Sequence, residues 1–298
     1  MNFKQGLEDA GFEVNPGLWK FYEDNYQERS DQEGGMANMS GADHSILEQP
    51  VSQYEEYEYE GQNVLEYSES YSDVAVLVIG RAGGEGSDAV MEMDGYTGGD
   101  AGKHYLELQS VEQELLSYIE QNYETVIVVL NIAMPMETGF IDDEAVDAAF
   151  WVGMPGSKGC GSFGKILAGD VNPSGHLADT YAYALESAPS YYNFGDYTYS
   201  NFEGNNKYVY YQEGIYVGYR YYETAAADGF IDYDETVQFP FGYGLSYTTF
   251  DWEVGETKLG EVGGTISVDV KVTNTGDVAG KDVVQLYYAS PYDPEEGI

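Results

Sequence analysis

Two runs of apolar residues dominate the hydrophobic pattern, and each has the length of a β-strand. Residues 74–79 read VAVLVI and residues 126–130 read VIVVL. Continuous apolar runs of this length are typical of strands that are buried on both faces of a parallel sheet. A third, shorter apolar stretch covers residues 145–152. We therefore expect three strands of one sheet in this part of the chain.

Helical patterns separate these runs. Four apolar residues between the first two runs recur at helical spacing: Leu108, Val111, Leu115 and Ile119. Ser110 with Gln113 has the pattern of a capping box at the start of this helix, and a second helix is expected over 162–167. Strands that alternate with helices of this length predict an α/β fold, in which helices sandwich a mostly parallel sheet.

The first 72 residues have a weaker periodicity. Short helices are expected over 4–10 and 17–25, on either side of an extended segment at 12–14. Residues 28–72 are polar and include a tyrosine- and glutamate-rich stretch at 54–60, which predicts a long loop.

The period of the pattern changes after Tyr247. Residues 266–272 alternate between apolar and polar side chains, which predicts a half-buried antiparallel strand, and residues 283–288 predict the next strand after a turn at 274–276. A β-sandwich domain needs about seven strands and roughly 100 residues, whereas only 51 residues follow Tyr247 in this chain of 298. We therefore expect an α/β domain over 1–247 and a truncated all-β sandwich over 248–298.

Composition narrows the possible partners. The chain has 53 acidic and 12 basic side chains and a net charge of −41, so its surface repels nucleic acid and anionic lipid. No apolar run reaches the roughly 18 residues that would cross a bilayer. The single cysteine, Cys160, has no internal disulfide partner, and the three histidines lack zinc-site spacing. We expect no metal, no organic cofactor and no nucleic-acid or membrane partner.

Five segments together resemble family 3 glycoside hydrolases, chiefly β-glucosidases. They are VAVLVIGRAGGEGSD at 74–88, GDVNPSGHLADT at 169–180, YQEGIYVGYRYYE at 211–223, FPFGYGLSYTTF at 239–250 and VTNTGDVAGKDVVQLY at 272–287. The resemblance implies that 1–247 is the α/β-sandwich domain of that family and that 248–298 begins its fibronectin type III-like domain. The family's TIM barrel has no counterpart in these segments. The helix-rich opening and the EGSD variant at 85–88 resemble a rearranged branch of the family, in which a barrel would follow residue 298.

Glu85 is the main candidate for chemistry. It lies in a glycine-rich loop, 83–86, just past the carboxyl end of the first buried strand, and ligands bind at that edge of open α/β sheets. Neighbouring glycines let a backbone bend sharply and let a substrate approach closely. The resemblance implies that Glu85 is the acid/base of a retaining glycosidase, because the family's acid/base glutamate comes from this loop.

Two other residues near the loop are candidates for substrate binding. Asp88 stands where it could bind or orient sugar hydroxyls, although the Asp-Arg pair of many relatives is here Asp88-Ala89. Arg81 is expected to pair with Glu85 or Asp88. The family's nucleophile is an aspartate on a barrel strand, and neither Asp73 nor Asp88 has that context, so we expect the chain to lack the nucleophile.

The resemblance implies that the chain is part of an exo-acting β-glucosidase that hydrolyses terminal β-linked glucose, and that it is inactive alone. Its expected partners are a carbohydrate substrate and the missing barrel. A β-xylosidase of the same family is the near alternative. A non-catalytic carbohydrate-binding or structural module and a nucleotide-binding α/β protein are the others, although the glycines at 80–86 do not fit the dinucleotide fingerprint.

Overall fold

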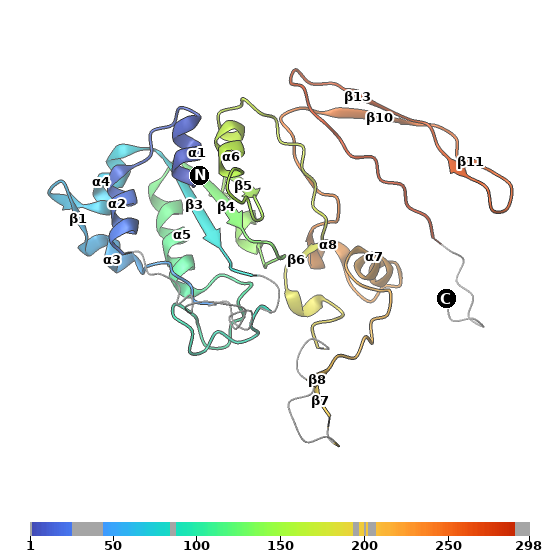
Figure 1. Cartoon of the computed structure of the whole chain (residues 1–298), viewed down its shortest axis with the longest axis horizontal. Coiled ribbons are helices and arrows are strands. Elements are labelled where there is room, and N and C mark those ends of the chain that lie inside the picture. Colours follow the sequence, from blue (N-terminus) through green and yellow to red (C-terminus); the bar gives the residue numbers. More distant parts are fainter. Residues whose placement is uncertain are drawn as a thin grey trace.

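A parallel sheet of three strands lies at the centre of the α/β part of the chain (Figure 1). The computed structural model describes residues 2–25, 44–83, 88–192, 197–199, 201 and 207–289. The strands are β3 (Val74–Gly80), β4 (Thr125–Asn131) and β5 (Ala148–Trp151), in the order β3-β4-β5 with both pairs parallel. The predicted α/β fold with a parallel sheet is confirmed.

Four helices build the main core on one face of this sheet. They are α2 (Pro16–Asp24), α3 (Val51–Glu56), α4 (Val64–Tyr71) and α5 (Ser110–Asn122). Leu77 and Ile79 of β3 belong to the same buried cluster as Leu115 and Ile119 of α5. The apolar stripe of α5 that the sequence predicted therefore faces the sheet.

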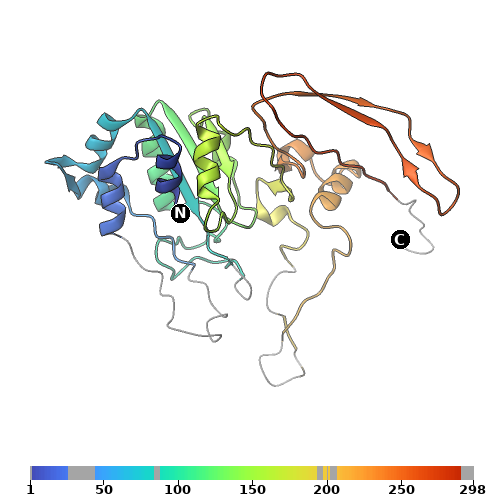
Figure 2. The same ribbon diagram turned by 45° about the horizontal axis from the view of Figure 1, so that its top comes forward.

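Two further helices, α1 (Phe3–Asp9) and α6 (Cys160–Leu167), lie side by side near β5 (Figures 1 and 2). Phe163 of α6 makes edge-on ring contacts with Phe150 of β5 and with Phe3 of α1, at 5.6 Å between ring centroids in each case. The two helices approach so closely that a Cβ at Gly6 or Gly164 would collide with the backbone of the other helix. Glycine at both positions permits this crossing.

The strand β3 is buried on only one face, contrary to the sequence prediction. Val74, Val76 and Val78, which alternate with the core residues, are 45%, 37% and 38% exposed. The reason is position, because β3 is an edge strand in the described sheet, whereas Val128 and Val129 of the central strand β4 are both fully buried.

The long loop predicted over 28–72 is wrong for its described part. Residues 51–71 form α3, the hairpin of β1 (Glu58–Tyr59) with β2 (Gln62–Asn63), and α4. Tyrosine made this stretch look polar, yet Tyr54 is 1% exposed and stacks on Phe21 at 4.1 Å. Residues 28–43 lie outside the described residues.

The remaining elements come after β4 in the sequence. They are η2 (Gly139–Asp142), β6 (Tyr181–Ala182), η3 (Leu185–Ser187), β7 (Tyr197–Thr198), β8 (Lys207–Tyr208), α7 (Tyr219–Ala227), α8 (Tyr233–Thr236), β9 (Val237–Phe239), β10 (Phe250–Val254), β11 (Lys258–Leu259), β12 (Ile266–Ser267) and β13 (Val270–Asn274). Among the described residues, the strands after β5 pair in antiparallel twos, such as β6 with β9. No helix in the described ranges is long and apolar enough to cross a membrane.

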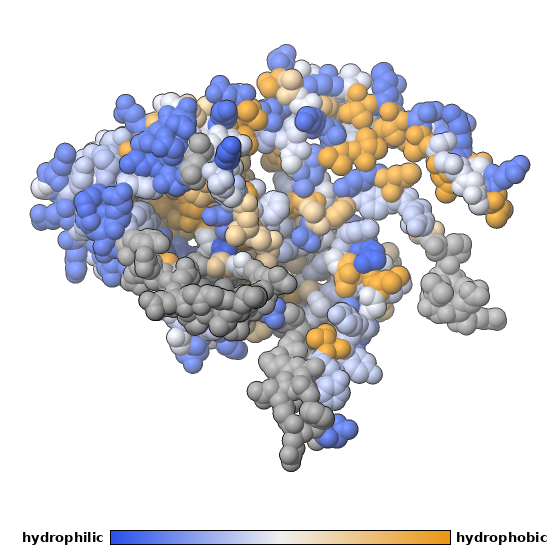
Figure 3. Space-filling view, viewed as in Figure 1, coloured by the Kyte–Doolittle hydropathy of each residue, from blue (hydrophilic) through white to orange (hydrophobic). Residues whose placement is uncertain are grey.

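The last part of the chain forms a long antiparallel ribbon, as the alternating pattern predicted (Figure 1). β10 pairs with β13 from Phe250↔Asn274 to Val254↔Val270. The strand predicted over 283–288 is wrong, because these residues have no strand partner among those described. Hydrophobic residues gather on the surface around β10 and β13 (Figure 3), and Trp252, Ile266 and Leu286 are 41%, 53% and 65% exposed. The domain division near Tyr247 stays a prediction.

The exposed apolar ribbon predicts uneven local stability. In the isolated chain, amides of 265–288 should exchange with deuterium quickly, whereas those of β3 and β4 should be protected, because two-stranded ribbons are marginal in water and lack a covering layer. Hydrogen exchange with peptide resolution measures this difference. Exchange over 265–288 as slow as that of β4, in a monomer, would contradict the expectation.

The close crossing of α1 and α6 gives a second prediction. Gly164→Ala should lower the free energy of unfolding by about 1–3 kcal/mol, because the added methyl group collides with the Gly6 carbonyl. Alanine is otherwise the better helix former, so a loss would show that the collision decides the outcome. Gly175→Ala is the matched control, since nothing lies within 4 Å of its Cβ position. Equal stability of both variants by urea denaturation would exclude the close crossing.

Candidate active site

The glycine loop leaves the sheet where the sequence predicted, at the carboxyl end of β3. Ala82 and Gly83 follow the end of β3, and a Cβ at Gly83 would lie 2.9 Å from the Cε atom of Met134, which follows β4. Glu85 falls within 84–87, outside the described residues. The chain is described again from Asp88, whose side chain is exposed. The roles of Glu85 and Asp88 stay predictions.

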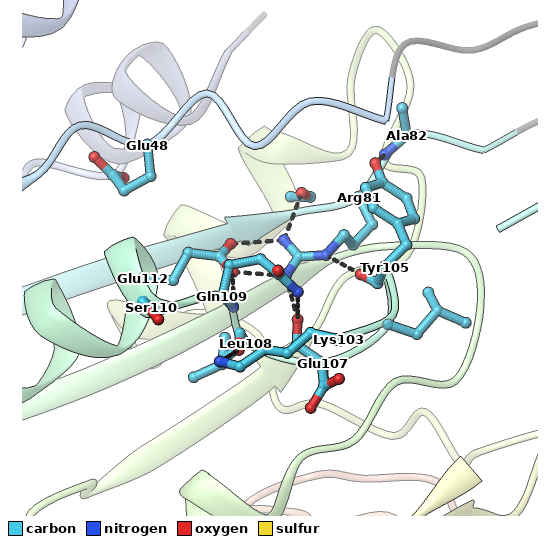
Figure 4. Close-up of polar contacts among 12 residues, drawn as sticks. Glu48, Arg81, Ala82, Lys103, Tyr105, Glu107, Leu108, Gln109, Ser110 and Glu112 are labelled. Carbon is cyan, nitrogen blue, oxygen red and sulfur yellow. Dashed lines mark hydrogen bonds and ion pairs between the residues drawn. The ribbon is translucent and has the colours of Figure 1, made fainter. Parts of the chain in front are cut away.

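Arg81 is placed differently from the expectation (Figure 4). Its side chain is 0% exposed, and both terminal nitrogens bind the Glu112 carboxylate, at 2.6 and 2.7 Å. The other donors reach the backbone carbonyl oxygens of Gly80, Tyr105 and Glu107. All five N–H groups of the guanidinium are therefore engaged within the fold.

Pairing of Arg81 with Glu85 or Asp88 was expected, and among the described residues its carboxylate partner is instead Glu112, in a buried ion pair. A contact between Arg81 and a sugar stays a prediction, and it would require the guanidinium to leave this partner. Sequence reasoning missed Glu112, although its place in the first turn of a helix next to the sheet was the available signal.

Glu112 also determines where α5 begins. One of its oxygens accepts a hydrogen bond from the Gln109 backbone N–H at 3.0 Å, which is the reciprocal bond of a capping box. The cap therefore lies at Gln109 and Glu112, one residue before the predicted pair of Ser110 and Gln113. Ser110 instead donates from its backbone N–H and its hydroxyl to Asp100.

Gln109 completes this buried network and is itself 0% exposed. Its amide nitrogen donates to the carbonyl oxygens of His104 and Glu107, and its amide oxygen accepts from the Asp100 N–H. A buried polar network with every group satisfied holds its segments rigidly. The network joins the end of β3, the segment 100–109 and the start of α5.

A half-buried carboxyl group, Glu48, lies apart from the Arg81 pair (Figure 4). Burial raises the pKa of Glu48 above its usual value, although hydrogen bonds from Tyr54 and Tyr22 oppose the shift. Its contacts hold the segment before α3 against α2, so its role is structural.

His104, Glu107 and Glu137 bring together the residue types of a metal site, which their spacing in the sequence did not indicate. The His104 Nε2 atom lies 3.2 Å from a Glu137 oxygen and 3.9 Å from a Glu107 oxygen. The His104 Nδ1 atom, however, accepts a hydrogen bond from the Leu106 N–H. A neutral ring then carries its proton on Nε2 and donates it to Glu137, which leaves no lone pair for a metal ion.

This cluster acts instead as a hydrogen-bonded junction. Glu137 accepts hydrogen bonds from His104 and from the Leu185 N–H. Burial acts to raise the pKa of Glu137, but the two hydrogen bonds outweigh it, so the pKa lies below its usual value. The junction ties the segment before α5 to the segments after β4 and β6.

An acidic groove of about 660 Å³ runs beside this junction, between α5 and η2. Five carboxylates line it: Glu107, Glu120, Glu137, Asp142 and Asp143. Burial and the neighbouring charge of Asp143 raise the pKa of Glu120. Phosphate groups would be repelled at this groove.

The described fold is an α/β domain, and a glycine-rich stretch of sequence follows its strand β3. Residues 22–219 match the family model described as the glycosyl hydrolase family 3 C-terminal domain. The chain therefore belongs to glycoside hydrolase family 3.

Relatives with assigned names are β-glucosidases. The β-glucosidase of Ruminococcus albus is 33% identical over 286 residues, which is 96% of this chain and 26% of that protein. β-Glucosidase A of Butyrivibrio fibrisolvens is 35% identical over 259 residues, 77% of this chain and 29% of that protein. The chain spans less than a third of the length of these two relatives.

Solved structures give the same result. A β-glucosidase from Paenibacillus barengoltzii superposes with a TM-score of 0.69 and 30% identity, over 92% of this chain and 26% of that one. β-Glucosidase 3B from Thermotoga neapolitana, solved with glucose, gives a TM-score of 0.66 and 28% identity, over 92% of this chain and 34% of that one.

The buried ion pair predicts a large and specific stability effect. Glu112→Gln should lower the free energy of unfolding by about 3–5 kcal/mol, because the Arg81 charge would stay buried without a counter-charge. Glu253→Gln is the matched control: Glu253 pairs with Lys271 on the surface, where such pairs contribute about 0–1 kcal/mol. Urea denaturation compares the two, and similar losses would contradict a special role for the Arg81 pair.

Proposed function

We propose that the chain is part of a retaining exo-β-glucosidase and that it supplies the general acid/base, Glu85. The observation that carries this proposal is the position of the glycine loop, at the carboxyl end of a strand in a family 3 domain. The names of the relatives support glucose over xylose as the sugar.

The proposed reaction needs two carboxyl groups about 5–5.5 Å apart. In the first step, the nucleophile attacks the anomeric carbon and forms a covalent glycosyl-enzyme. The bond from that carbon to the glycosidic oxygen breaks, and Glu85 donates its proton to this oxygen, so that the aglycone leaves as an alcohol. In the second step, Glu85 takes a proton from water, and the water replaces the enzyme at the sugar. The nucleophile belongs to the family's TIM barrel, which is the proposed partner of this chain.

Asp88 has a supporting role in this proposal. Its exposed carboxylate, at the exit of the loop, is available to accept hydrogen bonds from sugar hydroxyls. No metal ion or organic cofactor takes part in the proposed chemistry.

Replacement of Glu85 tests the proposal. In the protein that contains both this chain and its barrel, Glu85→Ala should slow the hydrolysis of substrates with poor leaving groups about 10²–10⁴-fold, because these groups need protonation to depart. Activated aryl glucosides should lose far less in the glycosylation step, and azide should partly restore deglycosylation. Steady-state kinetics with a series of aryl and alkyl β-glucosides measures both effects.

Two controls accompany this experiment. Glu124→Ala removes an exposed glutamate just before β4, at the opposite edge of the sheet, and should leave both substrate classes unchanged. The chain alone should hydrolyse no aryl β-glucoside above background, since it lacks the nucleophile. Equal losses on both substrate classes without azide rescue would move the acid/base role to another residue.

A further inference from the structure

Tyr105 bonds to the chain on both sides of the glycine loop. On the entry side, the Ala82 N–H donates to the Tyr105 hydroxyl at 2.7 Å, and Arg81 donates from Nε to the Tyr105 carbonyl at 2.6 Å. On the exit side, the Tyr105 N–H donates to the Val90 carbonyl at 3.0 Å. One residue thus joins the two stems of the loop through its hydroxyl, its carbonyl and its N–H.

The surroundings of Tyr105 fix its ring in place. Tyr105 is 0% exposed and packs with Met93 and Ile46, and Ala89 and Val90 of the exit stem pack against the same cluster. The Arg81 guanidinium carbon lies 5.4 Å from the ring centroid. Because Arg81 is itself held by Glu112, the hydroxyl that meets Ala82 is held by the buried network.

We propose that Tyr105 is a positioning residue for the proposed acid/base: its hydroxyl holds Ala82 relative to Val90 and so fixes the spacing of the two stems between which Glu85 lies in the sequence. This inference rests on the function proposed above. A general acid must lie within hydrogen-bond reach of the leaving oxygen, and a displacement of about 1 Å can cost about 100-fold in rate. The shape of the loop's two stems therefore controls catalysis without contact between Tyr105 and the sugar.

Tyr105→Phe tests the hydroxyl while the ring is kept. In the chain alone, the Ala82 amide should exchange with deuterium at least about tenfold faster, since it loses its acceptor. In the protein with its barrel, kcat on a poor leaving group should fall about 10- to 100-fold, whereas activated aryl glucosides should change less than about threefold. KM should stay nearly constant for both.

Tyr54→Phe is the matched control for loss of a buried tyrosine hydroxyl. Tyr54 is 1% exposed, and its hydroxyl bonds to Glu48 and Tyr22 rather than to the loop. If a residue has a purely structural role, its replacement lowers the amount of folded enzyme, so the rates on both substrate classes fall equally. We expect that pattern, at most, for Tyr54→Phe and the leaving-group split only for Tyr105→Phe.

The outcomes separate the two proposals. One outcome is that Glu85→Ala slows substrates with poor leaving groups more than activated ones, whereas Tyr105→Phe slows both equally. The positioning role is then overturned and the proposed function stands. If neither variant shows a larger rate loss on poor leaving groups than on activated ones, the proposed function is overturned as well. Unchanged exchange of the Ala82 amide in Tyr105→Phe overturns the positioning role by itself.

Discussion

A guanidinium inside a protein persists only when a counter-charge and hydrogen-bond acceptors surround it, because the cost of removing it from water is several kcal/mol. Arg81 meets this condition with Glu112 and three backbone carbonyl groups. The same pair ends β3, caps α5 through Gln109 and fixes the segment that carries Tyr105. The candidate site depends on this interaction, since the end of β3, the segment of Tyr105 and the start of α5 each meet the pair directly and the exit stem is joined to it through Tyr105.

Packing around the pair is uneven across the molecule. The helices α1 and α6 touch through two glycines, and the face of the sheet under α5 is fully buried. By contrast, the valines on the other face of β3 and the ribbon of β10 and β13 expose apolar side chains (Figure 3). We therefore expect the highest local stability at the sheet face under α5. The stems of the proposed acid/base loop adjoin this well-packed part.

The periodicity of the sequence was sufficient for β3, β4, α5 and α6, because long runs of one pattern determine the type of an element. It failed where burial was carried by residues that look polar. Tyr54 is buried through its ring, and Glu112 is buried because Arg81 needs it, so neither the helices after residue 50 nor the true cap of α5 could be read from hydropathy. The contacts of Tyr105 were equally hidden, since its hydroxyl meets Ala82 at a sequence separation of 23 residues.

The ion pair also bears on how a glutamate in this loop could act as an acid. A carboxyl group near an unpaired cation prefers its charged form, since the cation stabilises the carboxylate. Arg81 lies only four residues before Glu85, and a free guanidinium there would favour loss of the proton that the first catalytic step requires. Bidentate pairing with Glu112 neutralises that charge and holds it away from solvent. One buried pair thereby anchors the stem of the loop and gives a counter-charge to the cation that lies nearest to Glu85 in the sequence.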